Sequence, residues 1–178
     1  MAKMEIRLAG SGGQGVILAT IILAEAAIIA GKNTAQSQSY GPEARGGMCK
    51  AEVIVSDEQI GFTKVTKPTF LLALTQASLD KFGAAAGEDC VIMADSSLTI
   101  SDNLKAKKIY SLPILETAKV EVGKAFTANI VAVAAINRVL NLVDFDSLEK
   151  AVFMHIPKGT EEINRKALIA GDKLAQNI

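Results

Sequence analysis

The chain has 178 residues, of which 49% are hydrophobic, 21% charged and 4% aromatic, and its 19 basic and 19 acidic residues cancel. This length and composition predict one domain over residues 1–178 with a substantial core, and they exclude a disordered chain. The absence of a basic excess argues against a nucleic-acid-binding protein.

Strands and helices alternate along most of the sequence. Lys3 to Ala9 alternates apolar and polar residues, which is typical of a first strand, and a glycine-rich turn follows it. Further strands are expected over Cys49 to Ser56, Phe70 to Thr75, Cys90 to Ala94 and Lys108 to Leu112. Helices are expected over Val16 to Ala30, Ser78 to Ala86, Thr117 to Val122, Phe126 to Leu140, Phe145 to Phe153 and Gly159 to Gln176. The order predicts an α/β fold, a three-layer α/β/α domain with a mostly parallel sheet, although residues 34–70 show strands without a clear helix between them.

The first of these helices carries the most apolar run of the sequence. Glu25 interrupts it, and no other run is long and pure enough to cross a membrane. No basic segment precedes a cleavage site of the secretory type. We therefore expect a cytoplasmic protein that has neither a membrane nor a nucleic acid as a partner.

The turn between the first strand and the first helix has the pattern G-x-G-x-x-G, from Gly10 to Gly15. Glycines allow a ligand to approach the backbone, and the amides at a helix N-terminus favour an anion such as a phosphate. A nicotinamide dinucleotide enzyme would need an acidic residue ~20 positions further on, and none lies between Glu25 and Glu43. No Walker lysine follows the glycines either. Two interpretations stay open: an anion site, or glycines that only allow close packing of helix and strand.

A second segment is hard to explain as a simple connection. It runs from Gln36 to Gly47 and contains one acid–base pair, Glu43 and Arg45, between two turn signals. A glycine-rich loop with an arginine and an aromatic ring suits contact with a partner or a phosphate. The alternative is an exposed turn whose charges are solvated. The candidate interface residues are Tyr40, Gly41, Pro42, Glu43, Arg45, Gly46 and Gly47.

Together the two segments resemble the gamma subunits of the 2-oxoacid:ferredoxin oxidoreductases. The resemblance rests on Gly10-Ser-Gly-Gly-Gln-Gly-Val16 followed by Ser39-Tyr-Gly-Pro-Glu-Ala-Arg-Gly-Gly47, and it extends over the chain to Ala128-Asn129-Ile130. The second segment is more similar to the 2-oxoglutarate and branched-chain members than to the pyruvate members.

The resemblance implies a role inside a multisubunit enzyme. Such a complex decarboxylates a 2-oxoacid on thiamine diphosphate and Mg²⁺, passes electrons through iron–sulfur clusters to ferredoxin, and transfers the acyl group to coenzyme A. The implied partners are alpha and beta subunits and a ferredoxin-like subunit. This sequence has no thiamine signature and no closely spaced cluster cysteines, so the isolated chain is expected to bind none of these cofactors and to be inactive.

Within that family role, we expect no catalytic or metal-binding residues in this chain. The chemistry of the glycine turn indicates a site for coenzyme A phosphates. Its candidate residues are Gly10, Ser11, Gly12, Gly13, Gln14 and Gly15, with Arg45 as an anion partner. The alternatives are a stand-alone nucleotide-binding enzyme and a scaffold subunit without a ligand.

Four further residues favour structural interpretations. Cys49 and Cys90 are expected to be reduced core cysteines, and His155 has no evident metal partner. Asp95, which ends a strand, is expected to cap a turn rather than face a ligand. Asn129 could cap a helix or contact a neighbour.

Overall fold

The computed structural model describes residues 3–40, 47–176 and 178. Six strands form one mixed sheet in the order β2-β3-β1-β4-β5-β6. Their bounds are β1 Met4–Ser11, β2 Asn33–Tyr40, β3 Met48–Ser56, β4 Phe70–Ala73, β5 Val91–Asp95 and β6 Lys108–Leu112. β1, β4, β5 and β6 pair in parallel, whereas β3 runs antiparallel to both β1 and β2.

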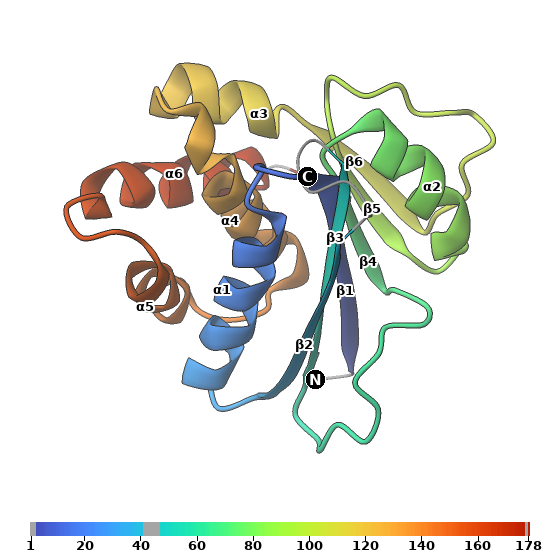
Figure 1. The fold of residues 1–178 in the computed structure, drawn as a ribbon, viewed down its shortest axis with the longest axis horizontal. Helices are drawn as coiled ribbons and strands as arrows, with labels where there is room; N and C mark the ends of the chain where they lie inside the picture. The colour runs from blue at the N-terminus through green and yellow to red at the C-terminus, as the bar shows by residue number, and fades with distance from the viewer. Residues whose placement is uncertain (1–2, 41–46, 177) are drawn as a thin grey trace.

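Helices cover both faces of the sheet, as Figure 1 shows. On one face lie α1 and the helices of the C-terminal half, and on the other lies α2. The bounds are α1 Val16–Ile29, α2 Gln76–Ala86, α3 Ile114–Glu116, α4 Ala128–Leu140, α5 Phe145–His155 and α6 Glu161–Leu174. A π-helix, Thr117–Val122, and a 3₁₀ turn, Ala125–Thr127, connect α3 to α4. The expected three-layer α/β fold is confirmed, with one heavily covered face and one lightly covered face.

Two apolar cores fill the spaces between these layers. The larger one lies between the sheet and the helices α1, α4, α5 and α6, and the smaller one lies under α2. Alternation along β1 divides its residues between them, because Leu8 joins the larger core and Ala9 the smaller. With no tryptophan in the chain, aliphatic side chains supply most of both cores.

The segment from 34 to 70 differs most from the sequence expectation. β2 is a regular strand of eight residues, although its sequence, Asn-Thr-Ala-Gln-Ser-Gln-Ser-Tyr, has no apolar alternation. It pairs along its whole length with β3, from Asn33 opposite Ser56 to Tyr40 opposite Cys49. Backbone pairing to a strongly apolar neighbour therefore fixes a strand that its own side chains do not predict.

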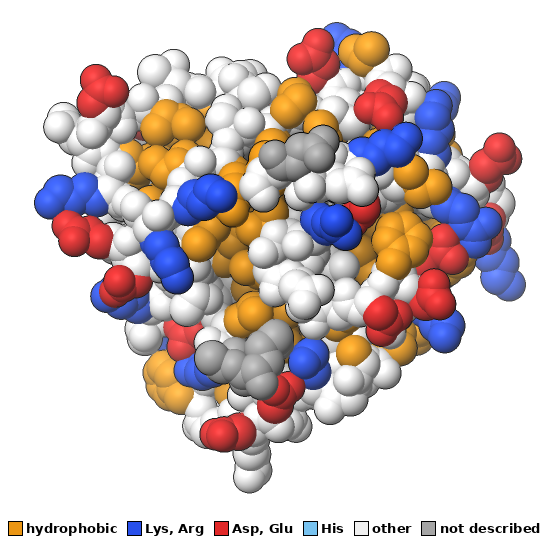
Figure 2. Space-filling view, turned by 180° about the vertical axis from the view of Figure 1, so that it is seen from behind, with side chains coloured by type: hydrophobic (Ala, Val, Ile, Leu, Met, Phe, Trp, Pro, Cys, Tyr) orange, Lys and Arg blue, Asp and Glu red, His pale blue; other side chains and the backbone are white. Residues whose placement is uncertain are grey.

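The surface carries no field of one sign on the face shown in Figure 2, where basic and acidic side chains are interspersed. This agrees with the zero formal net charge. Within residues 3–40 and 47–176, no helix is both long enough and apolar enough to cross a membrane.

Candidate functional site

The glycine turn lies between two adjacent parallel strands whose following helices pack on opposite faces of the sheet. β1 leads through the turn into α1 on one face, while the neighbouring parallel strand β4 leads into α2 on the other. The carboxyl ends of β1 and β4 are adjacent, with Ala9 opposite Ala73. In open α/β sheets, ligands bind in the crevice at such a switch point. The strand–glycine–helix order expected from the sequence is confirmed.

Side-chain and backbone bonds hold the turn in a defined shape. The Ser11 amide donates to Gln14 Oε1 at 2.7 Å, and Gln14 Nε2 donates to the Leu74 carbonyl of the neighbouring segment at 3.4 Å. The Gln14 carboxamide therefore bridges the turn and the end of β4. A side chain at Gly10 would require the Gln14 carboxamide to move and would disturb this bridge. Gln14 is a positioning residue, a role that the spacing of the glycines alone did not indicate.

Two further glycines of the turn, Gly13 and Gly15, have backbone conformations that favour glycine. Gly13 is exposed, has a φ of 96°, and would carry a Cβ into open space, so the backbone is accessible there. Gly15, with a φ of 70°, is the N-cap of α1, and no side chain caps the helix. The first amides of an α-helix have no partner within the helix. The turn therefore presents backbone N–H groups at the positive end of α1, which suits an anion.

The two segments that carry the family resemblance meet at this end of the sheet. The Gly12 amide donates to the Gly47 carbonyl at 3.0 Å, and Ser11 pairs with Met48 between β1 and β3. Tyr40 ends β2 opposite Cys49. The structure thus brings the glycine turn next to Gly47, while Tyr40 lies at the same end of the sheet but on the far side of β3. The candidate residues Gly41, Pro42, Glu43, Arg45 and Gly46 lie outside the described residues.

Asn129, at the start of α4, packs against Gly15 at the end of the turn. Its amide nitrogen lies 2.6 Å from the position that a Cβ on Gly15 would occupy. Its Oδ1 accepts a bond from the Ile130 amide at 3.0 Å, and the residue is only 6% exposed. The carboxamide of Asn129 thus serves both roles that the sequence left open, because it satisfies one of the first amides of α4 and contacts the neighbouring glycine turn.

Asp95 lies at the same end of the sheet and has a structural role. Its Oδ1 accepts bonds from the Ser97 amide at 3.0 Å and from the Ser97 hydroxyl at 2.6 Å. Its Oδ2 accepts from the Leu115 amide at 2.8 Å. Both carboxylate oxygens are thus used to hold the turn after β5 and the start of α3. The expected capping role is confirmed.

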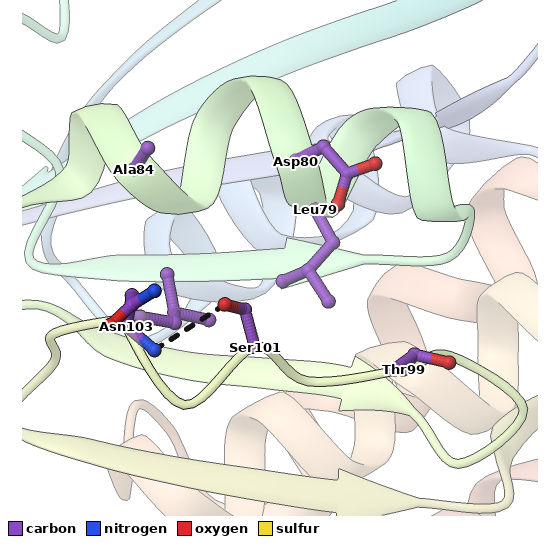
Figure 3. A pocket seen from close by; sticks show the side chains of 7 residues that line it. Leu79, Asp80, Ala84, Thr99, Ser101 and Asn103 are labelled. Carbon is purple, nitrogen blue, oxygen red and sulfur yellow. Dashed lines mark hydrogen bonds between the residues drawn. The ribbon is translucent and has the colours of Figure 1, made fainter.

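A separate small pocket lies between α2 and the segment from Thr99 to Leu104 (Figure 3). Two of its polar side chains already accept hydrogen bonds from nearby groups. Asp80 accepts from Gln76 at 2.8 Å, and Ser101 Oγ accepts from the Asn103 amide at 3.3 Å. Asp80 is the one charged residue among the described residues that line it, and its negative charge does not suit an anionic ligand, so this pocket is a weaker candidate for a phosphate than the glycine turn.

The residues that most often bind metals are dispersed. No three His, Cys, Asp or Glu side chains come together in the described part of the chain. Both cysteines are buried and reduced, and burial raises the pKa of the Cys90 thiol to about 11. Because a thiol must lose its proton to bind a metal, Cys90 is a poor ligand at neutral pH. His155 Nε2 lies 3.8 Å from Glu25 Oε2 and accepts or donates no hydrogen bond within the described residues.

Comparison with known proteins identifies the group to which this fold and turn belong. The family model described as pyruvate ferredoxin/flavodoxin oxidoreductase matches residues 5–174. The chain belongs to this oxidoreductase family. The 2-oxoglutarate synthase subunit KorC from Methanocaldococcus jannaschii is 42% identical over 179 residues, which cover 99% of this chain and 96% of the relative.

Solved structures agree with this family assignment. The gamma subunit of a keto/oxoacid ferredoxin oxidoreductase from Geobacter sulfurreducens superposes with a TM-score of 0.84 at 43% identity, over 98% of this chain and 99% of that one. A 2-oxoglutarate:ferredoxin oxidoreductase from Magnetococcus marinus gives 0.88 at 22% identity; it covers 99% of this chain and 31% of the longer one, and supports the fold alone. Within the oxidoreductase family, this chain is a gamma subunit of a multisubunit 2-oxoacid:ferredoxin oxidoreductase.

Proposed function

We propose that this gamma subunit serves a complex that converts 2-oxoglutarate to its acyl-coenzyme A product, and that its glycine turn receives the phosphates of coenzyme A. The 2-oxoglutarate assignment is supported by the 42% identity to a 2-oxoglutarate synthase subunit over almost the whole of both chains. In the proposed complex, alpha and beta subunits hold thiamine diphosphate with Mg²⁺, and a ferredoxin-like subunit carries iron–sulfur clusters. This chain supplies no catalytic side chain.

One observation carries the coenzyme A proposal: the backbone amides at the start of α1 have no capping side chain, and they lie at the switch point of the sheet. Coenzyme A is the substrate of this reaction class that carries phosphates, and helix N-termini bind phosphate through such amides. The structurally related Magnetococcus marinus enzyme was solved with 2-oxoglutarate, coenzyme A and succinyl-coenzyme A bound. A stand-alone nucleotide enzyme is disfavoured, because β2 contains no acidic residue for a ribose.

Replacement of Gly13 by alanine is expected to raise the KM for coenzyme A in the assembled complex by about tenfold or more. The added methyl group would occupy the open side of the turn. Gly31→Ala is a matched control, because Gly31 also has a positive φ, 77°, and open space at its Cβ, but follows the far end of α1. Both variants should lose about 1–2 kcal/mol of stability from the left-handed backbone. Equal coenzyme A KM values for the two complexes would support the scaffold role without a ligand.

We further propose that the segment from Ser39 to Gly47 contacts another subunit of the complex. The proposal rests on its composition, with Tyr40 and Arg45 between glycines, since Tyr and Arg are enriched where protein interfaces gain most of their energy. Its C-terminal end, Gly47, also accepts a hydrogen bond from the glycine turn. A subunit that binds this segment would therefore approach the proposed coenzyme A site.

Replacement of Arg45 by alanine is expected to weaken association with the partner subunits by about 2 kcal/mol or more, which corresponds to a loss of about thirtyfold in affinity. Size-exclusion chromatography at limiting concentration, followed by activity measurement, checks this result. Arg138→Ala is the control, because Arg138 is half exposed and its one ion pair within the described residues is a 4.0 Å contact with Asp172. Arg45→Ala chains that assemble and turn over like the control would contradict a contact role.

A further inference from the structure

The amide nitrogen of Asn129 is a hydrogen-bond donor without a partner at the edge of the glycine turn. Within the described residues, the only hydrogen bond of this side chain is made by its oxygen, to the Ile130 amide. The residue is 94% buried, since only 6% of its surface is exposed. In the described part of the chain, two side-chain atoms, Glu5 Oε2 and His155 Nε2, are fully enclosed and have no hydrogen-bond partner. The Asn129 nitrogen is not fully enclosed in this way. It therefore faces space that solvent can enter.

The position of this donor is fixed by packing. Asn129 Nδ2 lies against Gly15, at 2.6 Å from an added Cβ, and the Asn129 Cβ lies at 3.0 Å. A side chain at position 15 would displace the carboxamide, so Gly15 serves both the left-handed start of α1 and the approach of Asn129. α4 itself is embedded in the larger core, with Ile130, Val131 and eight further residues buried. The donor thus stands on a rigid element.

A partially buried donor without a partner is costly unless a ligand or water completes it. Asn129 adds a side-chain N–H to the backbone N–H groups of the turn and of the first turn of α1. Several N–H donors that lie close together favour a compact oxyanion with several acceptor oxygens, and a phosphate group has this chemistry. The glycine turn and α4 are distant in sequence, and the fold brings them together.

We infer that Asn129 and the backbone amides of the glycine turn together form a phosphate-binding site, with Asn129 as its side-chain donor. The inference uses the proposed coenzyme A role only to identify the natural ligand. The site itself recognises a phosphate group, and inorganic pyrophosphate is a suitable probe of it.

The first test uses the full-length chain, titrated with pyrophosphate and followed by amide ¹H–¹⁵N spectra. The amides of Gly13, Gly15 and Val16 are expected to shift together in the wild-type chain. Asn129→Asp keeps the acceptor for the Ile130 amide but replaces the donor by a charged oxygen, and it should weaken pyrophosphate binding about tenfold or more. Asn129→Ala removes the donor without adding charge and should weaken binding about threefold to tenfold.

A matched control separates the local effect from the change in net charge. Asn141→Asp adds the same charge at the other end of α4, on an exposed residue whose φ of 46° an aspartate tolerates. This variant should bind pyrophosphate within about twofold of the wild type. The inference is overturned if both Asn129 variants bind as the control does. It is also overturned if the shifts are scattered over surface lysines, which would mean nonspecific ion adsorption.

The coenzyme A KM of the assembled complex distinguishes failure of this inference from failure of the proposed function. A raised KM in Gly13→Ala, with wild-type KM in both Asn129 variants, would retain the coenzyme A role and remove Asn129 from it. Loss of pyrophosphate binding in Asn129→Asp, with an unchanged coenzyme A KM, would retain the phosphate site and reject coenzyme A as its ligand.

Discussion

Replacement of Gly171 by alanine is expected to destabilise the chain by about 2 kcal/mol or more, which lowers its melting temperature by roughly 4–8 °C. Gly171 lies in α6 where this helix packs against α4. An added Cβ would collide with the Val131 carbonyl oxygen and would lie 2.9 Å from the Ala134 Cβ. Neither neighbour can turn away, because one is backbone and the other is a methyl group on a buried helix. Overpacking therefore exceeds the gain in helix propensity of about 1 kcal/mol.

The same substitution at Gly83 provides the control for this effect. Gly83 is also a buried glycine within a helix, α2, but its added Cβ would meet the ends of flexible side chains, with Leu104 Cδ1 at 3.1 Å. Because these side chains can move, Gly83→Ala should have a melting temperature equal to or above that of the wild type. Thermal unfolding followed by circular dichroism measures both. Equal tolerance at the two positions would refute the close approach of α4 and α6.

Removal of Glu52 is expected to have a still larger effect on stability. Arg7 Nε lies 2.6 Å from Glu52 Oε1, and both side chains are 9% exposed. The guanidinium also donates to the Val65 carbonyl at 3.2 Å and lies over the Phe82 ring. Glu52→Leu would leave the arginine buried without its counter-charge, at a cost of about 3–5 kcal/mol. Urea unfolding of the variant gives the free energy directly.

The reciprocal variant should be milder, because Glu52 has a second cation. Lys50 Nζ lies 3.1 Å from the same oxygen, Glu52 Oε1, so the carboxylate stays partly compensated in Arg7→Met. The double variant, Arg7→Met with Glu52→Leu, should recover most of the loss, since apolar groups of similar size often replace a buried pair without penalty. Additive losses in the double variant would show that the pair is not coupled.

Most of the fold could be predicted because the apolar patterns agree with the packing. The strand at Lys108 to Leu112 is confirmed with the same bounds, and the long helices differ from expectation by at most two residues at either end. The hairpin of β2 and β3 could not be predicted in this way. Its edge strand has no apolar face, and only pairing with β3 places it. Likewise, the π-helical geometry of Thr117–Val122 has no counterpart in a periodic pattern.

The candidate site was predicted in part. The glycine turn could be located because its residue types reflect a local backbone requirement, seen in the positive φ of Gly13 and Gly15. The contact of the turn with Asn129 depends on how α4 packs across α1, and the spacing of 114 residues between Gly15 and Asn129 (129 − 15) carries no local signal. The side chain of Gln14 is a similar case, because its partner Leu74 lies 60 residues further along.

The edge strand β2 affects the solubility of the unassembled subunit. One row of its backbone N–H and C=O groups faces outward, because β3 pairs with only one side of it. Natural edge strands are usually protected from other strands by lysine, proline or a bulge. The eight residues from Asn33 to Tyr40 include no charged residue and no proline, whereas β6, at the opposite edge, begins with Lys108 and is followed by Pro113. A gamma chain whose β2 edge is left uncovered is therefore open to strand-to-strand aggregation through β2.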